Sequence, residues 1–152
     1  MKLRALSFAL CYNACRRRVE MTQTKELIDK LAFILIEDRS LLMARSYGQE
    51  LFFNVGGRRE PGETDEQAVT REVREETGLE LRPPVRPMNT FKGKAHGGGE
   101  MKMACYSARH IGRPSPAREV EELAWFTTAD MHRTTPMGQK ILQWLKDEDL
   151  ID

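Results

Sequence analysis

The chain has 152 residues, of which 40% are hydrophobic and 31% charged, and its formal net charge is +1. This length predicts one globular domain with its own core, and the near-neutral charge argues against a nucleic-acid polymer as partner, because proteins that bind phosphate backbones usually carry a clustered basic surplus. No run approaches the roughly 18 apolar residues that a membrane helix needs, and three cysteines without zinc-site or disulfide spacing favour a reducing, cytoplasmic setting.

Residues 1–20 carry five basic side chains and no acid before Glu20. This composition resembles a targeting segment, but the apolar part is short and no small-x-small cleavage site follows it. The alternative is a poorly ordered extension, with Met21 as the working initiator. We predict the extension, followed by one domain over residues 21–152.

Residues 30–37 contain six consecutive apolar residues, LAFILI, between charged ones. So short and unalternating a run predicts a strand that is buried on both faces, central in a sheet with helices on each side. Polar residues 37–40 then predict a turn, and residues 41–44 the second strand of a hairpin. Residues 51–53 predict a further short strand.

Two glycines, Gly56 and Gly57, follow that strand, and glycine lets the backbone turn and approach a ligand closely. Arg45 and Phe52 precede them and are candidates for substrate contact. The alternative for both is an ordinary position, on the surface for arginine and in the core for phenylalanine.

Residues 65–77 are predicted to form a helix. Thr64 and Gln67 fit a capping box at its start, and Gly78 supplies the left-handed residue that ends it. Val69 and Val73 fall on one side of this helix, which suits packing on a sheet.

Three glutamates on this helix, Glu72, Glu75 and Glu76, are spaced i, i+3 and i+4 and therefore share one face. Like charges in this arrangement destabilise a helix unless a positive group lies beside them. Arg71 can reach Glu75 as an i, i+4 partner, and clustered carboxylates are the ligands that hard divalent cations prefer. The pattern predicts a site for Mg²⁺ or Mn²⁺, and the alternative is a solvated helix face without chemistry.

The wider pattern favours the metal site. It reads Gly57-x5-Glu63-x7-Arg71-Glu72-Val73-x-Glu75-Glu76-x-Gly78-Leu79. Nine such positions would match by chance in a chain this long with odds on the order of one in a million. The pattern resembles the Nudix box of the Nudix hydrolase family at every position.

This resemblance implies an α/β protein with the Nudix fold, an α/β/α sandwich around a mixed β-sheet. It also implies that the three glutamates bind the metal ions and that the backbone carbonyl of Gly56 adds a ligand. Arg71 and Glu63 belong to the same catalytic set. Gly57 and Arg58 are expected beside the substrate, and Arg58 stands where many members have lysine, as Val55 stands where many have proline.

The chain after the box predicts strands over residues 85–94 and 101–106, separated from the box by the chain-breaking Pro83–Pro84. The glycine-rich loop 94–100 between them is predicted as a hairpin connection. The alternative is a flap that closes over a nucleotide, with Lys92, Lys94 or His96 near phosphate. Alternation places Met101, Met103 and Cys105 on one strand face, where Cys105 is expected to pack rather than react.

An acidic loop precedes a predicted strand at residues 123–126. Many Nudix enzymes carry a further functional glutamate in this loop, and Glu119 or Glu122 would match. The alternative is that both are solvated surface acids. Thr135 and Pro136 then predict the start of a last helix, which should cover the sheet face opposite the metal helix.

The resemblance implies a metal-dependent pyrophosphohydrolase that cleaves the phosphoanhydride of a nucleoside triphosphate or another nucleoside diphosphate derivative. Size and layout are similar to the MutT-like subgroup, which removes oxidised guanine nucleotides, although residues 132–136 lack the asparagine that MutT itself places there. A non-catalytic nucleotide-binding sensor on the same fold is the alternative. The general base, a box glutamate or one from the acidic loop, stays open, as does the choice between monomer and homodimer.

Overall fold

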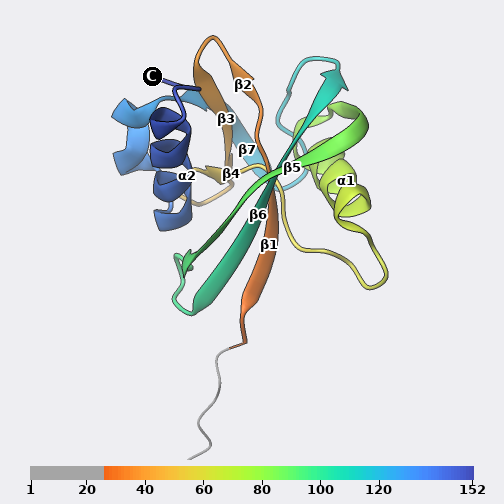
Figure 1. Ribbon diagram of the computed structural model, residues 1–152, viewed down its shortest axis with the longest axis horizontal. Helices are drawn as coiled ribbons and strands as arrows, with labels where there is room; N and C mark the ends of the chain where they lie inside the picture. Colours follow the sequence, from red (N-terminus) through yellow and green to blue (C-terminus); the bar gives the residue numbers. More distant parts are fainter. Residues whose placement is uncertain (1–25) are drawn as a thin grey trace, which may run out of the picture.

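The computed structural model describes residues 26–152, so the predicted extension at residues 1–20 lies outside the described part of the chain. Two helices lie on opposite sides of the strands, α1 (Asp65–Thr77) on one side and α2 (Pro136–Asp147) on the other (Figure 1). The structure therefore confirms the predicted α/β/α sandwich and the position of the last helix opposite the first.

The strands form two sheets. In the first, β1 (Ile28–Phe33) pairs in parallel with β6 (Glu100–Ile111), and β6 pairs antiparallel with β5 (Glu80–Lys94). In the second, β3 (Ser40–Ser46) is central and pairs antiparallel with three strands, which are β2 (Ile36–Glu37), β4 (Phe53–Asn54) and β7 (Val120–Phe126). A short 3-10 helix, η1 (Thr128–Arg133), connects β7 to α2.

The apolar run at the start of the domain is buried because its side chains enter two different cores. Ala32 and Ile34 lie in the α2-side core, the cluster that includes the buried face of α2. Leu31, Phe33 and Leu35 lie in the α1-side core, the cluster that includes the buried face of α1. The prediction of burial on both faces is confirmed.

This run is nevertheless two strands rather than the single strand predicted over residues 30–37. Ile34 N–H still donates to Tyr106 O of β6, whereas Leu35 O accepts from Leu42 N–H of β3. The chain thus passes from the first sheet to the second at residues 34–35. The predicted hairpin follows as β2 and β3.

Helix α1 begins and ends where the sequence predicts. Thr64 Oγ1 accepts from Gln67 N–H at 3.2 Å, and Gln67 Oε1 accepts from Thr64 N–H at 2.9 Å, which completes the capping box. Gly78 has a φ of 71° and ends the helix. Val69 and Val73 are buried in the α1-side core.

The second half of the chain differs from prediction at the prolines. Pro83–Pro84 does not end a strand: β5 runs from Glu80 to Lys94, and its register against β6 shifts between Arg82 and Arg86. Such an irregularity accommodates residues that have no N–H for the ladder. Beyond it, the glycine-rich loop is the turn of the β5–β6 hairpin, as predicted.

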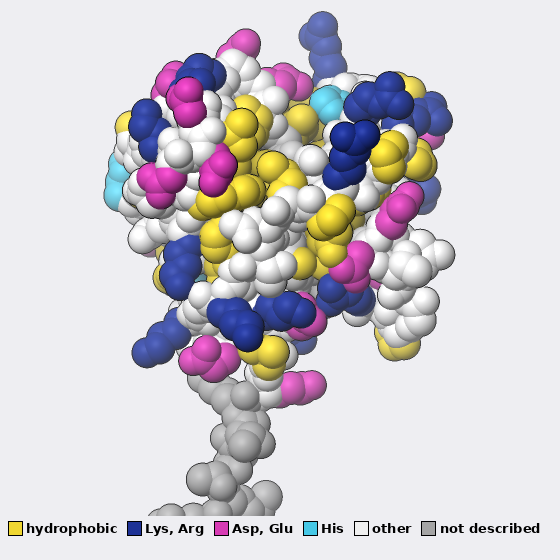
Figure 2. All heavy atoms as spheres, viewed as in Figure 1, with side chains coloured by type: hydrophobic (Ala, Val, Ile, Leu, Met, Phe, Trp, Pro, Cys, Tyr) yellow, Lys and Arg dark blue, Asp and Glu magenta, His cyan; other side chains and the backbone are white. Residues whose placement is uncertain are grey.

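The face of β6 toward α2 also agrees with prediction, because Met101, Met103 and Cys105 are all buried in the α2-side core. Burial raises the pKa of the Cys105 thiol to about 12, which is consistent with packing rather than reactivity. On the molecular face in Figure 2, basic and acidic side chains are interspersed around apolar ones, in keeping with the near-neutral charge. Within residues 26–152, no helix has the length and apolar character needed to cross a membrane.

Candidate active site

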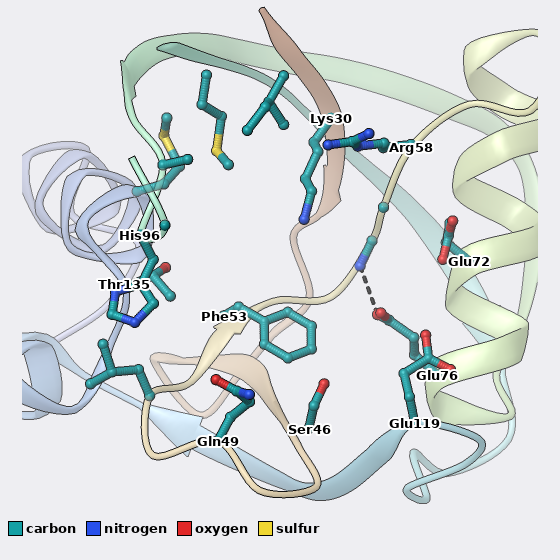
Figure 3. Close-up of a pocket in the computed structure, with 18 residues that line it drawn as sticks. Lys30, Ser46, Gln49, Phe53, Arg58, Glu72, Glu76, His96, Glu119 and Thr135 are labelled. Atoms are coloured by element: carbon teal, nitrogen blue, oxygen red, sulfur yellow. Dashed lines mark hydrogen bonds between the residues drawn. The ribbon is translucent and has the colours of Figure 1, made fainter. Parts of the chain in front are cut away.

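A cleft of about 550 Å³ lies beside α1 and receives side chains from segments distant in the sequence. Its lining comes from β1, from the end of β3 and the chain that follows it through β4 to α1, and from α1 itself. The β5–β6 turn, the start of β6, the loop before β7 and the start of α2 complete it. Figure 3 shows carboxylates on the α1 side of this cleft and His96 and Thr135 on the other side.

Glu76 is the buried carboxylate of the cleft, with only 3% of its surface exposed. Its Oε2 accepts a hydrogen bond of 2.8 Å from the N–H of Gly56, drawn as a dashed line in Figure 3. Burial raises the pKa of Glu76 to about 8, and this hydrogen bond opposes the rise. The charges of Glu72 and Glu119 raise the pKa further, whereas Lys30 lowers it. A cation placed next to a buried acid with so high a pKa stabilises its ionised form.

Two glycines let the loop lie close to these carboxylates and to β1. A Cβ at Gly57 would collide with the carboxylate of Glu72, so the absence of a side chain lets Glu72 lie against the loop backbone. A Cβ at Gly56 would collide with the backbone oxygen of Leu31, and Gly56 also has a φ of 136°. The double glycine therefore allows one loop to lie close to both α1 and β1.

Arg71 connects the acidic side chains of this region. Its guanidinium donates to both oxygens of Glu63, at 2.7 and 2.9 Å, and to Glu72 Oε1 at 2.9 Å. The predicted contact with Glu75 is present at 3.4 Å. The hydrogen bonds from Arg71, together with one from a backbone N–H, lower the pKa of Glu63 to about 2. Arg71 therefore orients Glu72 and Glu75, and Glu63 is its principal anionic partner.

The predicted metal ligands do not all occupy the cleft. Glu72, Glu76 and Gly56 line it, whereas Glu75 is bound by Arg71 and by Arg118, whose Nη1 lies 3.1 Å from Glu75 Oε1. In this arrangement, no group of three Asp, Glu, His or Cys side chains within residues 26–152 is assembled as a metal site. The donor set nevertheless fits a hard divalent cation, because a buried carboxylate, a second carboxylate and a backbone segment border one space.

The two glutamates predicted in one acidic loop have different surroundings, because β7 begins at Val120 and Glu122 lies within this strand, whereas Glu119 precedes it. Glu119 is exposed and lines the cleft, close enough for its charge to act on Glu76. Glu122 instead accepts a hydrogen bond from Arg45 at 2.8 Å. Of the two candidates, the structure brings Glu119 to the box carboxylates.

The family model for the NUDIX domain matches residues 29–145 of this chain. The chain belongs to the Nudix hydrolase family. It is 33% identical over 110 residues to the NAD-capped RNA hydrolase NudC of Stutzerimonas stutzeri (strain A1501), a match that covers 69% of this chain and 38% of that relative. The chain thus matches well under half the length of this curated relative.

Solved structures share the same Nudix fold. The solution structure of the E. coli ORF135 protein is 25% identical with a TM-score of 0.63, and the match covers 78% of this chain and 87% of that one. A MutT NUDIX hydrolase from Burkholderia pseudomallei is 21% identical with a TM-score of 0.64, and the match covers 77% and 95% of the two chains.

Two predicted substrate residues of this Nudix domain lie outside the cleft lining. Arg45 is held by glutamates of β7, where it also pairs with Glu121 at 2.6 Å. Phe52 is 2% exposed and packs in the α2-side core against Phe126, with ring centroids 4.7 Å apart. Phe53 lines the cleft instead, because successive strand residues point to opposite faces.

The remaining predicted residues, Gly57 and Arg58, line the cleft, as does His96 of the hairpin turn. Sequence reasoning missed Lys30 and Thr135 as cleft residues. The sequence pattern marks Thr135 only as the cap of the last helix. Lys30 precedes a buried strand, and nothing near it in the sequence marks it as more than a flanking charge.

Proposed function

We propose that this Nudix protein is a divalent-metal-dependent pyrophosphohydrolase that cleaves the phosphoanhydride of a nucleoside triphosphate or another nucleoside diphosphate derivative. The observation that carries the proposal is the buried carboxylate of Glu76 beside Glu72 in one cleft, within a complete Nudix box. Such a pair is costly without a cation and favourable with one.

The residues that would hold Mg²⁺ or Mn²⁺ are Glu72, Glu75 and Glu76, with the backbone carbonyl of Gly56. A bound divalent ion would neutralise phosphate oxygens and lower the pKa of bound water. For Glu75 to contribute, its carboxylate has to exchange contacts with Arg71 and Arg118 for the ion.

Three other residues have roles in orienting the ligands, binding phosphate and accepting a proton. Arg71, paired with Glu63, orients Glu72, and the exposed Arg58 is placed to bind a phosphate oxygen through its guanidinium. Glu119 is exposed in the cleft and accepts no side-chain hydrogen bond from the described residues, so we assign it as the proton acceptor for the attacking water.

A substrate screen with Mg²⁺ or Mn²⁺ tests this function. The panel contains the nucleoside triphosphates, an oxidised guanosine triphosphate as the MutT-like candidate, ADP-ribose and NAD. NAD is included because NudC, similar over 69% of this chain, is an NAD-capped RNA hydrolase. Release of phosphate, pyrophosphate or a mononucleotide identifies the bond that is cleaved.

Two substitutions on the same helix provide the controls. We expect Glu76→Gln to lower kcat by about 100-fold or more, whereas Glu66→Gln changes an exposed glutamate at an unspecified position of the box and should leave kcat unchanged. Equal turnover by the Glu76→Gln variant and the unmutated protein would exclude Glu76 from the metal site. Tight nucleotide binding without turnover by the unmutated protein would favour the sensor alternative.

A further inference from the structure

Lys30 and Arg58 lie next to each other on neighbouring segments of the chain. Leu31 N–H of β1 donates to Gly57 O at 2.8 Å, and a second such bond two residues further along makes residues 55–57 run antiparallel to β1. Lys30 precedes Leu31 and Arg58 follows Gly57, so the next position of this pairing brings the two basic residues together.

Both side chains border the cleft, and among the described residues neither has an acidic partner. Lys30 and Arg58 line the space, and the amine of Lys30 points into it (Figure 3). No carboxylate of residues 26–152 lies within 4.0 Å of either charged group. Two adjacent cations without counter-ions repel each other, which an anion between them relieves.

The carboxylates occupy a different side of the same cleft, where Figure 3 shows Glu72, Glu76 and Glu119 along α1 and the adjoining loop. The charge of Lys30 on the other side lowers the pKa of Glu76. The cleft therefore has one basic side and one acidic side.

A third part of the cleft is apolar. Phe53, Met101 and Met137 contribute to it, and Figure 3 shows the ring of Phe53 across the cleft from Lys30. Apolar and aromatic surface of this kind suits a nucleoside, whose ring can stack on Phe53. A phosphate chain attached to that nucleoside would then pass between the basic and the acidic sides.

We propose that Lys30 is a substrate-binding residue that, together with Arg58, contacts phosphoryl oxygens of the substrate without a metal ion between them. This inference rests on the proposed function and adds a recognition element to it. An ammonium group offers three donors to non-bridging oxygens, and the planar guanidinium beside it can bind two more. The paired cations favour a substrate with at least two phosphoryl groups, because a pyrophosphate chain carries more charge and offers more oxygens to the two side chains than a single phosphate does.

Binding of the α,β-methylene analogue of ADP tests this contact directly. We expect Lys30→Met to weaken binding about 10-fold, as a lost charge-assisted hydrogen bond should. The loss of affinity on Lys30→Met should be the same in metal-free buffer with a chelator and in buffer with Mg²⁺. The corresponding loss of affinity for AMP should be smaller. Lys30→Arg should restore most of the affinity, because it returns the positive charge.

Lys94→Met is the matched control. Lys94 is an exposed lysine directly before the hairpin turn that borders the cleft, but it does not line the cleft. The same change of charge there should leave affinity unaltered. Lys30→Gln serves as a second neutral variant, and thermal unfolding of each protein establishes that the fold is retained.

Unchanged affinity in a folded Lys30→Met or Lys30→Gln variant would overturn the proposal, and so would a loss seen only in Mg²⁺. Once a cleaved substrate is known, the folded Lys30→Met variant should have a higher KM and a nearly unchanged kcat. This result is expected for a residue that binds the substrate and the transition state equally well. A protein that cleaves no nucleotide, yet loses analogue affinity on Lys30→Met, would refute the proposed function and support the phosphate contact.

Discussion

Replacement of Glu76 by glutamine measures what the buried carboxylate costs the metal-free fold. Burial raises the pKa of Glu76 from its ordinary value of 4.5 to about 8, so between these pH values the folded state binds more protons than the unfolded state. The free energy of unfolding must therefore fall as pH rises through this window. At 1.36 kcal/mol per pKa unit, the difference corresponds to an upper limit of about 5 kcal/mol.

Glutamine is the appropriate substitute because it resembles the protonated acid. Its side-chain oxygen can still accept from the N–H of Gly56, and it cannot ionise. Below about pH 4.5 the variant and the unmutated protein should have similar stability, and above about pH 8 the variant should be more stable by several kcal/mol. Shifted pKa values are also found for the carboxyls of Glu63 and Asp65, the thiol of Cys105 and the phenol of Tyr106. Each of these groups titrates outside this pH window.

Urea unfolding at a series of pH values, in buffer with a chelator, provides the measurement. The unmutated protein should lose stability toward high pH and regain it when Mg²⁺ is added, because a bound cation favours the ionised carboxylate. The variant should show neither effect. Parallel stability profiles for the two proteins, or greater stability of the unmutated protein at high pH without metal, would refute this reasoning.

Two further substitutions separate the site from the scaffold. Gly57→Ala introduces a Cβ that collides with the Glu72 carboxylate and displaces that side chain. We therefore expect kcat to fall at least about 10-fold. Steady-state kinetics with increasing Mg²⁺ would measure the loss, and an unaltered kcat would contradict this expectation. Thr64→Ala removes the N-cap of α1 and should lower the free energy of unfolding by about 1 kcal/mol with kcat retained. Urea titration measures that change, and unaltered stability would mean that the cap does not contribute.

The helix that carries the box could be predicted in full because its signals are local. Thr64 and Gln67 bond to each other, Gly78 ends the helix, and Glu72 and Glu76 share a face by spacing alone. These relations hold within one or two turns and need no knowledge of the rest of the chain.

The substrate side of the cleft could not be predicted because it is assembled over long distances. Lys30 reaches Arg58 only through the pairing of β1 with residues 55–57, and Met137 reaches the cleft from the last helix. Adjacent phenylalanines give no local sign of which one faces the cleft, and the prediction of Phe52 as a substrate contact is therefore wrong, since Phe53 lines the cleft.

The two ends of the cleft are supported by the two different cores that β1 separates. Helix α1 and its carboxylates are backed by the α1-side core, whereas Met101 and Met137, at the apolar part of the cleft, belong to the α2-side core. Packing changes in separate clusters usually have independent effects. Substitutions in the α2-side core can therefore change the apolar part of the cleft, where the nucleoside is expected to bind. The carboxylates of α1 keep their support in the α1-side core.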